Sequence, residues 1–297
     1  MNDKAESARP MTMFVRSSPT LPAAWLLAAL CLAAPAKATA QWAQGAPGKL
    51  WVKSAVFVQK TDERYDALGD RVPWFASGES NSRAVFTDII VGLRRDLDLW
   101  VQIPYFDLRF EDVANDLRST GIGDVRAWLR WQFASIGNGS TPLALRVGAK
   151  APIGADSPDA FVIPLGEGQW DFEAFGEIGH SFWPLPVYAE LWLGYRARLE
   201  NSKKVFDPGG EYVFLAEAGV NPTSGILLKA TIDGFRARRL RADRVLTANK
   251  RRITTLQLAG AVQVGPVWPE VGVRIPVAGQ DFPAGTQLVF GASTRIR

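Results

Sequence analysis

The amino-acid sequence predicts an all-β protein, a single closed antiparallel transmembrane β-barrel of about 12 strands that is preceded by a cleavable signal peptide. Three observations predict this fold class. From Leu50 onward, strand-length segments alternate apolar and polar side chains, tight turns and long polar loops join these segments in turn, and an apolar leader precedes them. A chain that crosses a bilayer without long apolar helices can satisfy its backbone hydrogen bonds only as a closed barrel.

Residues 1–40 are predicted to be the signal peptide and residues 41–297 the outer-membrane barrel. Leu21 to Ala36 form an apolar block, Arg16 supplies a positive flank, and residues 38–40 read Ala-Thr-Ala. The block is too short for a relaxed transmembrane helix, and small residues at both ends of such a triplet are typical of a cleavage site. We therefore place the cut after Ala40. The alternative is a buried N-terminal helix.

Composition limits the chemistry of the mature chain. The 34 basic and 30 acidic residues fall to 30 and 28 when residues 1–40 are removed, so we expect no nucleic-acid partner. Cys31 is the only cysteine and lies in the leader, and His180 is the only histidine. We therefore expect no disulfide, no metal site built from thiolates or several histidines, and no cofactor.

Period-two alternation and turn residues predict where the strands lie. The predicted strands are residues 50–59, 83–93, 97–109, 124–134, 143–153, 170–182, 187–199, 211–220, 226–237, 252–263, 267–277 and 286–296. Their connections alternate between long and short, as external loops and periplasmic turns do in outer-membrane barrels. Both ends of the barrel chain then lie on the periplasmic side.

The alternation is clearest in residues 125–133 and 187–199, where every second residue is apolar and arginines occupy the other face. A soluble sheet would bury the apolar face in a core, whereas a barrel would turn it towards lipid and enclose the charges. The leader, the loop asymmetry and the lack of helices to cover a sheet favour the barrel. Aromatic residues near predicted strand ends are typical of membrane-interface girdles, and these are Trp131, Trp170, Trp183 and Tyr195.

The same alternation predicts which charged side chains line the lumen. They are Arg126, Arg130, Arg146, Lys150, Asp171, Glu173, Glu177, Glu190, Arg196, Arg198, Glu217, Lys229 and Asp233. We expect Lys150 to lie beside Asp171 or Glu173, and Arg146 to lie near Glu177. Two hypotheses are open for these residues: an ion-pair network that fills the lumen, and a polar constriction that selects small solutes.

Several motifs resemble those of a known family. Gly121-Ile122-Gly123-Asp124 opens a strand, Lys150-Ala151-Pro152-Ile153-Gly154 closes the next, and Leu165 to Asp171 reads LGEGQWD. Gly92 to Pro104 follows the pattern G-L-x-x-x-L-x-L-x-V-x-x-P. In order and spacing, these motifs resemble the outer-membrane barrel family named after the meta-pathway of phenol degradation, whose members are labelled transporters. The resemblance covers nearly the whole mature chain and implies passage of small, often aromatic or hydrophobic compounds.

The chain departs from that family at its end. Members of this and other barrel families usually end in an aromatic residue that the barrel-assembly machinery reads, but this chain ends Thr294-Arg295-Ile296-Arg297. The departure concerns the assembly signal and leaves the strand pattern intact.

The predicted function is passive transport of small, hydrophobic or aromatic solutes across the outer membrane of a Gram-negative bacterium, without enzymatic activity. The expected partners are outer-membrane lipid, the solute and the assembly machinery. Lipopolysaccharide is a further expected partner, because its phosphates could bind a basic loop that is equally consistent with simple solvation. That loop contains Arg236, Arg238, Arg239, Arg241, Arg244, Lys250, Arg251 and Arg252.

Two alternatives remain. One is a structural or lipopolysaccharide-interacting barrel without transport. The other is an outer-membrane hydrolase that uses Ser140 or Ser202 with His180. The neighbouring pair His180 and Ser181 cannot act as base and nucleophile, because adjacent residues of a strand point to opposite faces.

Overall fold

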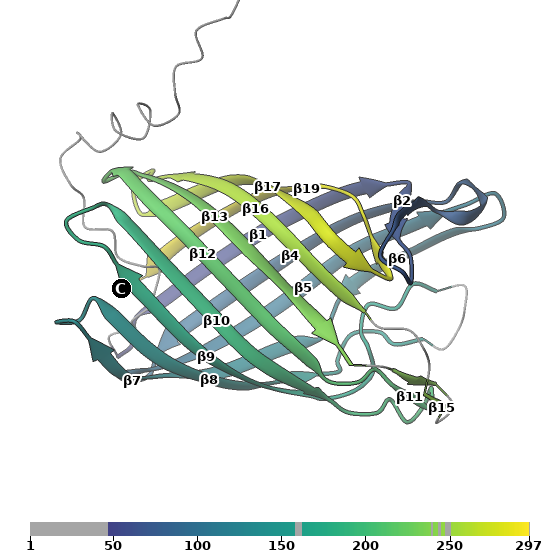
Figure 1. The fold of residues 1–297 in the computed structure, drawn as a ribbon, viewed down its shortest axis with the longest axis horizontal. Coiled ribbons are helices and arrows are strands. Elements are labelled where there is room, and N and C mark those ends of the chain that lie inside the picture. Colours follow the sequence, from purple (N-terminus) through teal and green to yellow (C-terminus); the bar gives the residue numbers. More distant parts are fainter. Residues whose placement is uncertain (1–46, 158–161, 239, 243–244, 247–250, 297) are drawn as a thin grey trace, which may run out of the picture.

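The computed structural model describes residues 47–157, 162–238, 240–242, 245–246 and 251–296, which form a closed antiparallel barrel (Figure 1). The wall strands are β1 (Leu50–Thr61), β4 (Glu79–Gly92), β5 (Leu97–Glu111), β6 (Asp116–Ile122), β7 (Val125–Ile136), β8 (Thr141–Ala151), β9 (Asp171–Ser181), β10 (Val187–Arg198), β12 (Glu211–Thr223), β13 (Ile226–Ala237), β16 (Arg252–Val262), β17 (Val267–Gln280) and β19 (Gln287–Ile296). β6 and β7 pair with different halves of β5 and share one position, so the wall has twelve strand positions.

The barrel is closed by its first and last strands. β1 pairs with β19 from Leu50↔Ile296 to Gln59↔Gln287, and its other edge pairs with β4. With β6 and β7 taken as one position, each of the remaining wall strands pairs with the wall strands that precede and follow it in the chain. The predicted fold class is therefore confirmed. The predicted signal peptide, residues 1–40, lies outside the described residues.

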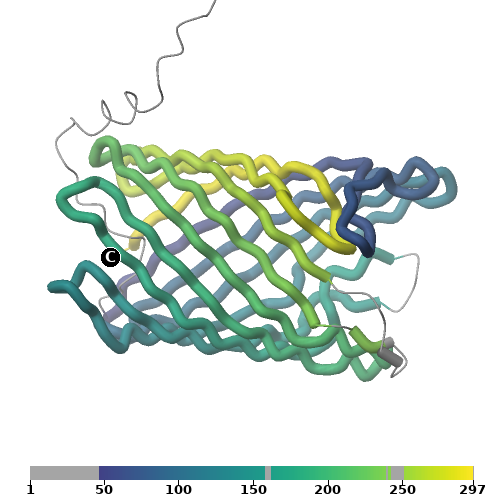
Figure 2. Tube along the Cα trace, in the orientation of Figure 1, coloured from purple at the N-terminus to yellow at the C-terminus, as the bar shows by residue number. Residues whose placement is uncertain are grey.

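The two ends of the barrel differ in their connections, as Figure 2 shows. One end, termed the short-turn end, carries the tight links such as those between β9 and β10 or between β12 and β13. β1 begins and β19 ends there (Figure 1). The other end, termed the long-loop end, carries the longer connections. The predicted alternation of long and short links is present in the structure.

The long-loop end contains structure where the sequence predicted only loops. β2 (Glu63–Tyr65), β3 (Arg71–Pro73) and β18 (Phe282–Pro283) form one small sheet, and β11 (Phe206–Asp207), β14 (Arg241–Ala242) and β15 (Val245–Leu246) form another. A single 3-10 turn, η1 (Phe75–Ser77), lies between β3 and β4, and no helix in the described ranges is long and apolar enough to span a membrane. Strands of two or three residues are too short for alternation to be recognised.

One predicted loop is wrong. Residues 110–123 were expected to be a loop, but β5 continues to Glu111 and β6 returns from Asp116. β6 has polar residues on both faces, since it reads Asp-Leu-Arg-Ser-Thr-Gly-Ile, so it lacks the lipid-facing pattern. The break between β6 and β7 lies opposite Pro104, which has no N–H, and the Pro104 carbonyl accepts a bond from the Gly123 N–H at 3.0 Å.

Side chains of the wall alternate between a buried interior and an exposed exterior. In β9, Asp171, Glu173, Phe175 and Glu177 are buried, whereas Phe172 and Ile178 are exposed. Exposed Leu, Ile, Val and Phe side chains recur on β6, β7, β8, β9, β10, β13, β16, β17 and β19, and β5 and β12 expose a tyrosine each. An apolar band of this extent around a closed barrel is the surface that a bilayer covers. The structure thus places the chain in a membrane as an outer-membrane-type barrel.

Leu193→Arg should destabilise the barrel by about 2–4 kcal/mol, because it places a charge on the lipid-facing surface near the middle of β10. Leu193 is 55% exposed on that surface. Val113→Arg is the matched control and should have little effect, because Val113 is 80% exposed at the tip between β5 and β6. Urea unfolding from lipid vesicles measures both, and equal losses would contradict the lipid-facing assignment.

Candidate functional site: a charged and aromatic lumen

All thirteen residues that were predicted to line the lumen lie on wall strands, and each of them is buried or half-buried. Lys150, Asp171, Glu173 and Arg198 are buried at the long-loop end, and Arg126 and Arg196 lie beside them. The middle of the lumen holds Arg130, Arg146 and Glu177, whereas Glu190, Glu217 and Lys229 lie closer to the short-turn end. Asp233 on β13 pairs with Arg274 on β17, across the intervening strand β16.

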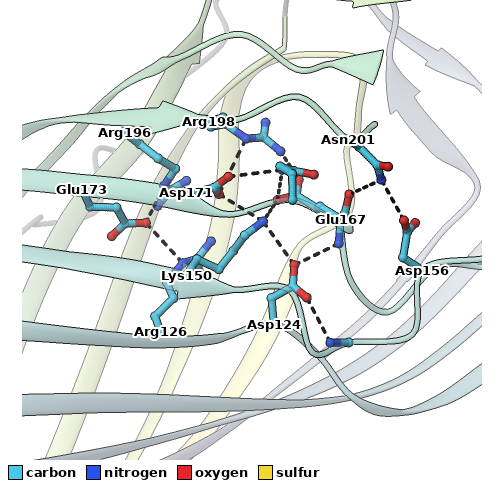
Figure 3. Close-up of polar contacts among 12 residues, drawn as sticks. Asp124, Arg126, Lys150, Asp156, Glu167, Asp171, Glu173, Arg196, Arg198 and Asn201 are labelled. Carbon is cyan, nitrogen blue, oxygen red and sulfur yellow. Dashed lines mark hydrogen bonds and ion pairs between the residues drawn. The ribbon is translucent and has the colours of Figure 1, made fainter. Parts of the chain in front are cut away.

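Lys150 is the centre of the network at the long-loop end (Figure 3). Its Nζ lies 3.1 Å from Asp124 Oδ2, 2.5 Å from Glu167 Oε2 and 3.1 Å from Asp171 Oδ2. The Lys150 side chain is 1% exposed and that of Asp171 is 0% exposed. A buried ammonium can donate three hydrogen bonds, and here it faces three carboxylates. The expected neighbourhood of Lys150 and Asp171 is thus present, with two further acids around it.

Asp124 ties both ends of the loop between β8 and β9 to the barrel wall. Its carboxylate accepts the Gly154 N–H at 3.1 Å and the Glu167 N–H at 2.9 Å. Gly154 and Gly166 pack against each other so closely that a Cβ on Gly154 would lie 2.8 Å from the Gly166 Cα, and one on Gly166 would lie 2.4 Å from Asp124 Oδ1. Three of the four motifs that carry the family resemblance therefore meet at this one point.

A second set of ion pairs continues the network along the wall. Glu173 accepts from Arg196 Nε at 2.6 Å, and Arg126 Nε lies 3.3 Å from the same carboxylate. Glu211 bridges Arg196 Nη1 at 2.7 Å and Arg198 Nη1 at 2.8 Å. Arg198 also pairs with Glu167. Because each carboxylate serves two cations, loss of one residue leaves several groups incompletely paired.

The loops are attached to this network by polar side chains. Asn201 Nδ2 donates to Asp156 Oδ2 at 2.7 Å and to the Glu167 carbonyl at 2.9 Å (Figure 3). Lys204 also pairs with Asp156. The loop after β8 and the loop after β10 are thereby joined to each other. Polar contacts, and not an apolar core, hold these two loops together at the long-loop end of the barrel.

Arg146 occupies the middle of the lumen. Its Nε lies 2.6 Å from Glu177 Oε1, so the expected nearness of these residues is present. Its guanidinium carbon lies within 4.2–5.4 Å of the ring centroids of Trp100, Trp128, Phe175 and Trp192. Cation–π contacts of this kind are strongest where water is excluded, and the Arg146 side chain is 4% exposed. Next to it on β7, Arg130 pairs with Asp98.

A separate group of charges lies nearer the short-turn end. Glu270 lies 2.9 Å from Lys229 Nζ and 3.3 Å from Lys53 Nζ. Glu217 accepts hydrogen bonds from Tyr188 Oη and Thr231 Oγ1, both at 2.7 Å. The Tyr188 ring lies flat against Gly219, where a Cβ would lie 2.3 Å from its Cε1.

Sequence reasoning missed several members of these groups. Asp124 was placed at a strand end, and Glu167 and Glu211 border predicted loops, so alternation assigned them no lumen face. Asp98 and Glu270 do lie on predicted strands, but only the register places Asp98 opposite Arg130, and only the folded wall brings Glu270 on β17 to Lys229 on β13 across β16. The alternation in residues 125–133 and 187–199 does place Trp128 and Trp192 on the charged face, but the sequence did not show that they, Trp100 and Phe175 meet around one arginine.

Glu167 lies in the loop between β8 and β9, outside the membrane-spanning strands. Burial raises the pKa of its carboxyl, but the Arg198 and Lys150 cations lower this pKa by more than burial raises it. The pKa of Glu167 therefore lies well below the ordinary 4.5. Glu167 is therefore a carboxylate at neutral pH. Within the described ranges, no group of His, Cys, Asp and Glu side chains is arranged to bind a metal ion.

The fold is that of known outer-membrane barrels. No family model matches the chain, and no curated protein matches it. The COG4313 outer membrane channel from Pseudomonas putida F1 has a TM-score of 0.72 to this chain at 14% identity, over 87% of this chain and 100% of that one. This chain is an outer-membrane β-barrel in fold.

Two other solved structures are less similar. The translocator domain of the autotransporter NalP from Neisseria meningitidis has a TM-score of 0.49 at 13% identity, over 86% of this chain and 90% of that one. The Ralstonia pickettii toluene transporter TbuX has a TM-score of 0.45 at 9% identity, over 84% of this chain and 90% of that one.

Lys150→Ala should destabilise the barrel by about 3–5 kcal/mol, because it leaves buried carboxylates without their cation. The matched control is Lys60→Ala. Its ion pair with Glu79 is exposed, with 67% of the Lys60 side chain in contact with solvent, so the loss should be at most about 1 kcal/mol. Denaturant midpoints in detergent micelles give both values. Similar losses for the two variants would show that the buried network is unimportant for stability.

The Glu167 ion pairs should weaken in acid. Because the folded-state pKa is below 4.5, the pairs stabilise the protein fully above that pH, and the contribution falls as pH drops towards the folded-state pKa. The stability difference between the wild type and Glu167→Gln should therefore shrink as pH falls below about 4.5. Urea titrations across this range measure it, and a difference that is independent of pH would contradict the assignment.

Proposed function

We propose that this barrel passively transports small, hydrophobic or aromatic solutes across the outer membrane. The observation that carries the proposal is the combination of a closed twelve-position barrel with an interior that places aromatic rings in the middle of a charged lumen. Such rings offer flat apolar solutes a surface that water-filled pores lack. Similarity in fold to an outer membrane channel over that channel's whole length supports the proposal.

The lumen residues would act as a selective constriction. Twelve strands about 4.8 Å apart and tilted by about 40° give a backbone diameter of roughly 24 Å, most of which inward side chains occupy. The ion pairs around Lys150, Glu173 and Glu211 fix those side chains in position. We assign both roles to the lumen residues. Their ion pairs fill most of the lumen, and because this network is rigid, the passage that remains has a constant size and can select solutes.

The motif resemblance extends the proposal to family membership. We infer that the chain is related to the barrels named after the phenol meta-pathway, since the motifs of that family converge on Asp124 and Lys150. Residues 1–40 would be its export signal, and the assembly machinery would insert the barrel. Lipopolysaccharide phosphates would bind the basic loop. Within that loop, Arg251 stacks on Phe282 at 4.6 Å, which leaves fewer arginines for the phosphates.

The alternatives have less support. For a hydrolase, His180 Nδ1 is engaged with Thr141 Oγ1 at 2.7 Å, and the Ser140 hydroxyl donates to the Gly137 carbonyl at 2.8 Å. Neither arrangement presents a serine nucleophile to His180. A purely structural barrel would not require aromatic rings around a mid-lumen cation, so we favour transport.

Toluene uptake by cells that express the barrel should exceed that of cells without it. Gly219→Ala should reduce this uptake severalfold, because an inward Cβ would displace the Tyr188 ring into the lumen. Gly176→Ala is the matched control on the lipid-facing side, where a Cβ would meet nothing within 4 Å, and it should leave uptake unchanged. Heat-modifiable gel mobility verifies that each variant folds. Uptake equal to that of cells without the barrel would refute transport of this solute, and turnover of an ester panel would instead support the hydrolase.

A further inference from the structure

The aromatic rings around Arg146 form a cage, defined here as Trp100, Trp128, Phe175 and Trp192. The distances from the Arg146 guanidinium carbon to these ring centroids are 4.7, 5.4, 4.6 and 4.2 Å, in that order. The four rings come from four different wall strands, β5, β7, β9 and β10, and the cation comes from a fifth, β8. Aromatic cages that surround a cation from several sides are used to bind guanidinium and quaternary ammonium groups.

The wall positions the rings independently of Arg146. Trp100 Nε1 donates to Asp88 Oδ1 at 3.0 Å, and Trp128 Nε1 donates to Glu173 Oε2 at 2.7 Å. These bonds hold the indole edges and leave the faces turned to the lumen. Glycine at 148 gives Trp128 its place, because a Cβ there would lie 2.3 Å from Trp128 Cδ1.

Phe175 is placed in the same way. A Cβ on Gly194 would lie 2.3 Å from Phe175 Cδ1, so the ring can lie against the wall only because that position is glycine. A cage held by hydrogen bonds and glycines should survive removal of the cation at its centre.

The charges around the cage favour a cation. Glu177 already pairs with Arg146, and its carboxylate is 0% exposed. Glu190 lies on the lumen face of β10 two residues before Trp192 and directly opposite Glu217, and among the described residues its side chain has neither an ion pair nor a hydrogen bond. In addition, Trp192 Nε1 is buried without an acceptor in the described ranges. The acidic groups would accommodate a cationic guest, and the Trp192 N–H can donate to an oxygen atom where the guest carries one.

We propose that the cage is a binding site for organic cations of the guanidinium or quaternary ammonium class, and that Arg146 is its built-in occupant. While Arg146 fills the cage, it narrows the lumen at mid-height. When Arg146 leaves, the cage and Glu177 present the same π faces and carboxylate to a free cation. This site is additional to the hydrophobic solute class proposed above and does not depend on it.

Single-channel recording on Arg146→Ala in a planar bilayer tests the proposal. Conductance of this variant should rise severalfold above that of the wild type, because the Arg146 side chain no longer narrows the middle of the lumen. Millimolar guanidinium or tetramethylammonium should then block the open variant, whereas sodium at equal ionic strength should not. Adding Trp192→Leu should weaken the block by about tenfold, the factor that corresponds to about 1.4 kcal/mol. A folded Arg146→Ala barrel that organic cations do not block overturns the proposal.

Arg196→Ala is the matched control. It removes another lumen arginine, one that is held by Glu173 and Glu211 and has no ring contact among the described residues. Its conductance should be insensitive to guanidinium, and an equal block would show that loss of any lumen arginine suffices. If Arg146→Ala fails to fold, Trp192→Leu alone should raise the conductance of the Arg146-containing barrel, and an unchanged conductance would refute the cage.

The outcome is separable from that of the transport assay. Toluene uptake is measured on the intact barrel in cells, whereas cation block is measured on the purified variant. Absence of toluene uptake together with guanidinium block would remove the proposed solute and retain the cage.

Discussion

The Lys150 ammonium joins the wall, the loops and the lumen at one point. Its three carboxylate partners come from the β6–β7 break, the loop after β8 and the start of β9. An isolated charge in such a buried position would cost several kcal/mol, and the cost is offset only when all partners are in place. This requirement explains why Asp124 also binds the backbone of the loop: the same carboxylate that compensates Lys150 fixes the loop ends.

The barrel inverts the arrangement of a soluble protein, and the inversion sets the energetics of both surfaces. Outside, Leu, Val and Phe need no partner because lipid covers them. Inside, each Arg and Glu needs a partner within hydrogen-bonding distance, since little water is available among packed side chains. The chain of ion pairs from Arg126 through Glu173 and Arg196 to Glu211 is the result.

The aromatic residues in the lumen are constrained by space and not by charge. A ring that projected straight inward from a narrow barrel would collide with the opposite wall. Trp128, Phe175 and Tyr188 avoid this collision because each ring lies flat against a glycine of the neighbouring strand. The space left in the middle is filled by the Arg146 guanidinium, which bonds to the ring faces and to Glu177 at once. The same arrangement narrows the lumen and makes it a candidate binding site.

The sequence by itself determined the fold class, the strand number and the inward faces. The reason is that a strand has a period of two and lipid accepts only apolar side chains, so the pattern in residues 187–199 has one meaning once a membrane is assumed. Where lipid imposes no pattern, as in β6, β2 and β3, the sequence showed only loops. Tertiary structure alone decided which charges meet. Register brings Asp98 to Arg130, and a loop excursion brings Glu167 to Lys150. Closure of the barrel brings four rings from separate strands around Arg146, a contact that no local spacing encodes.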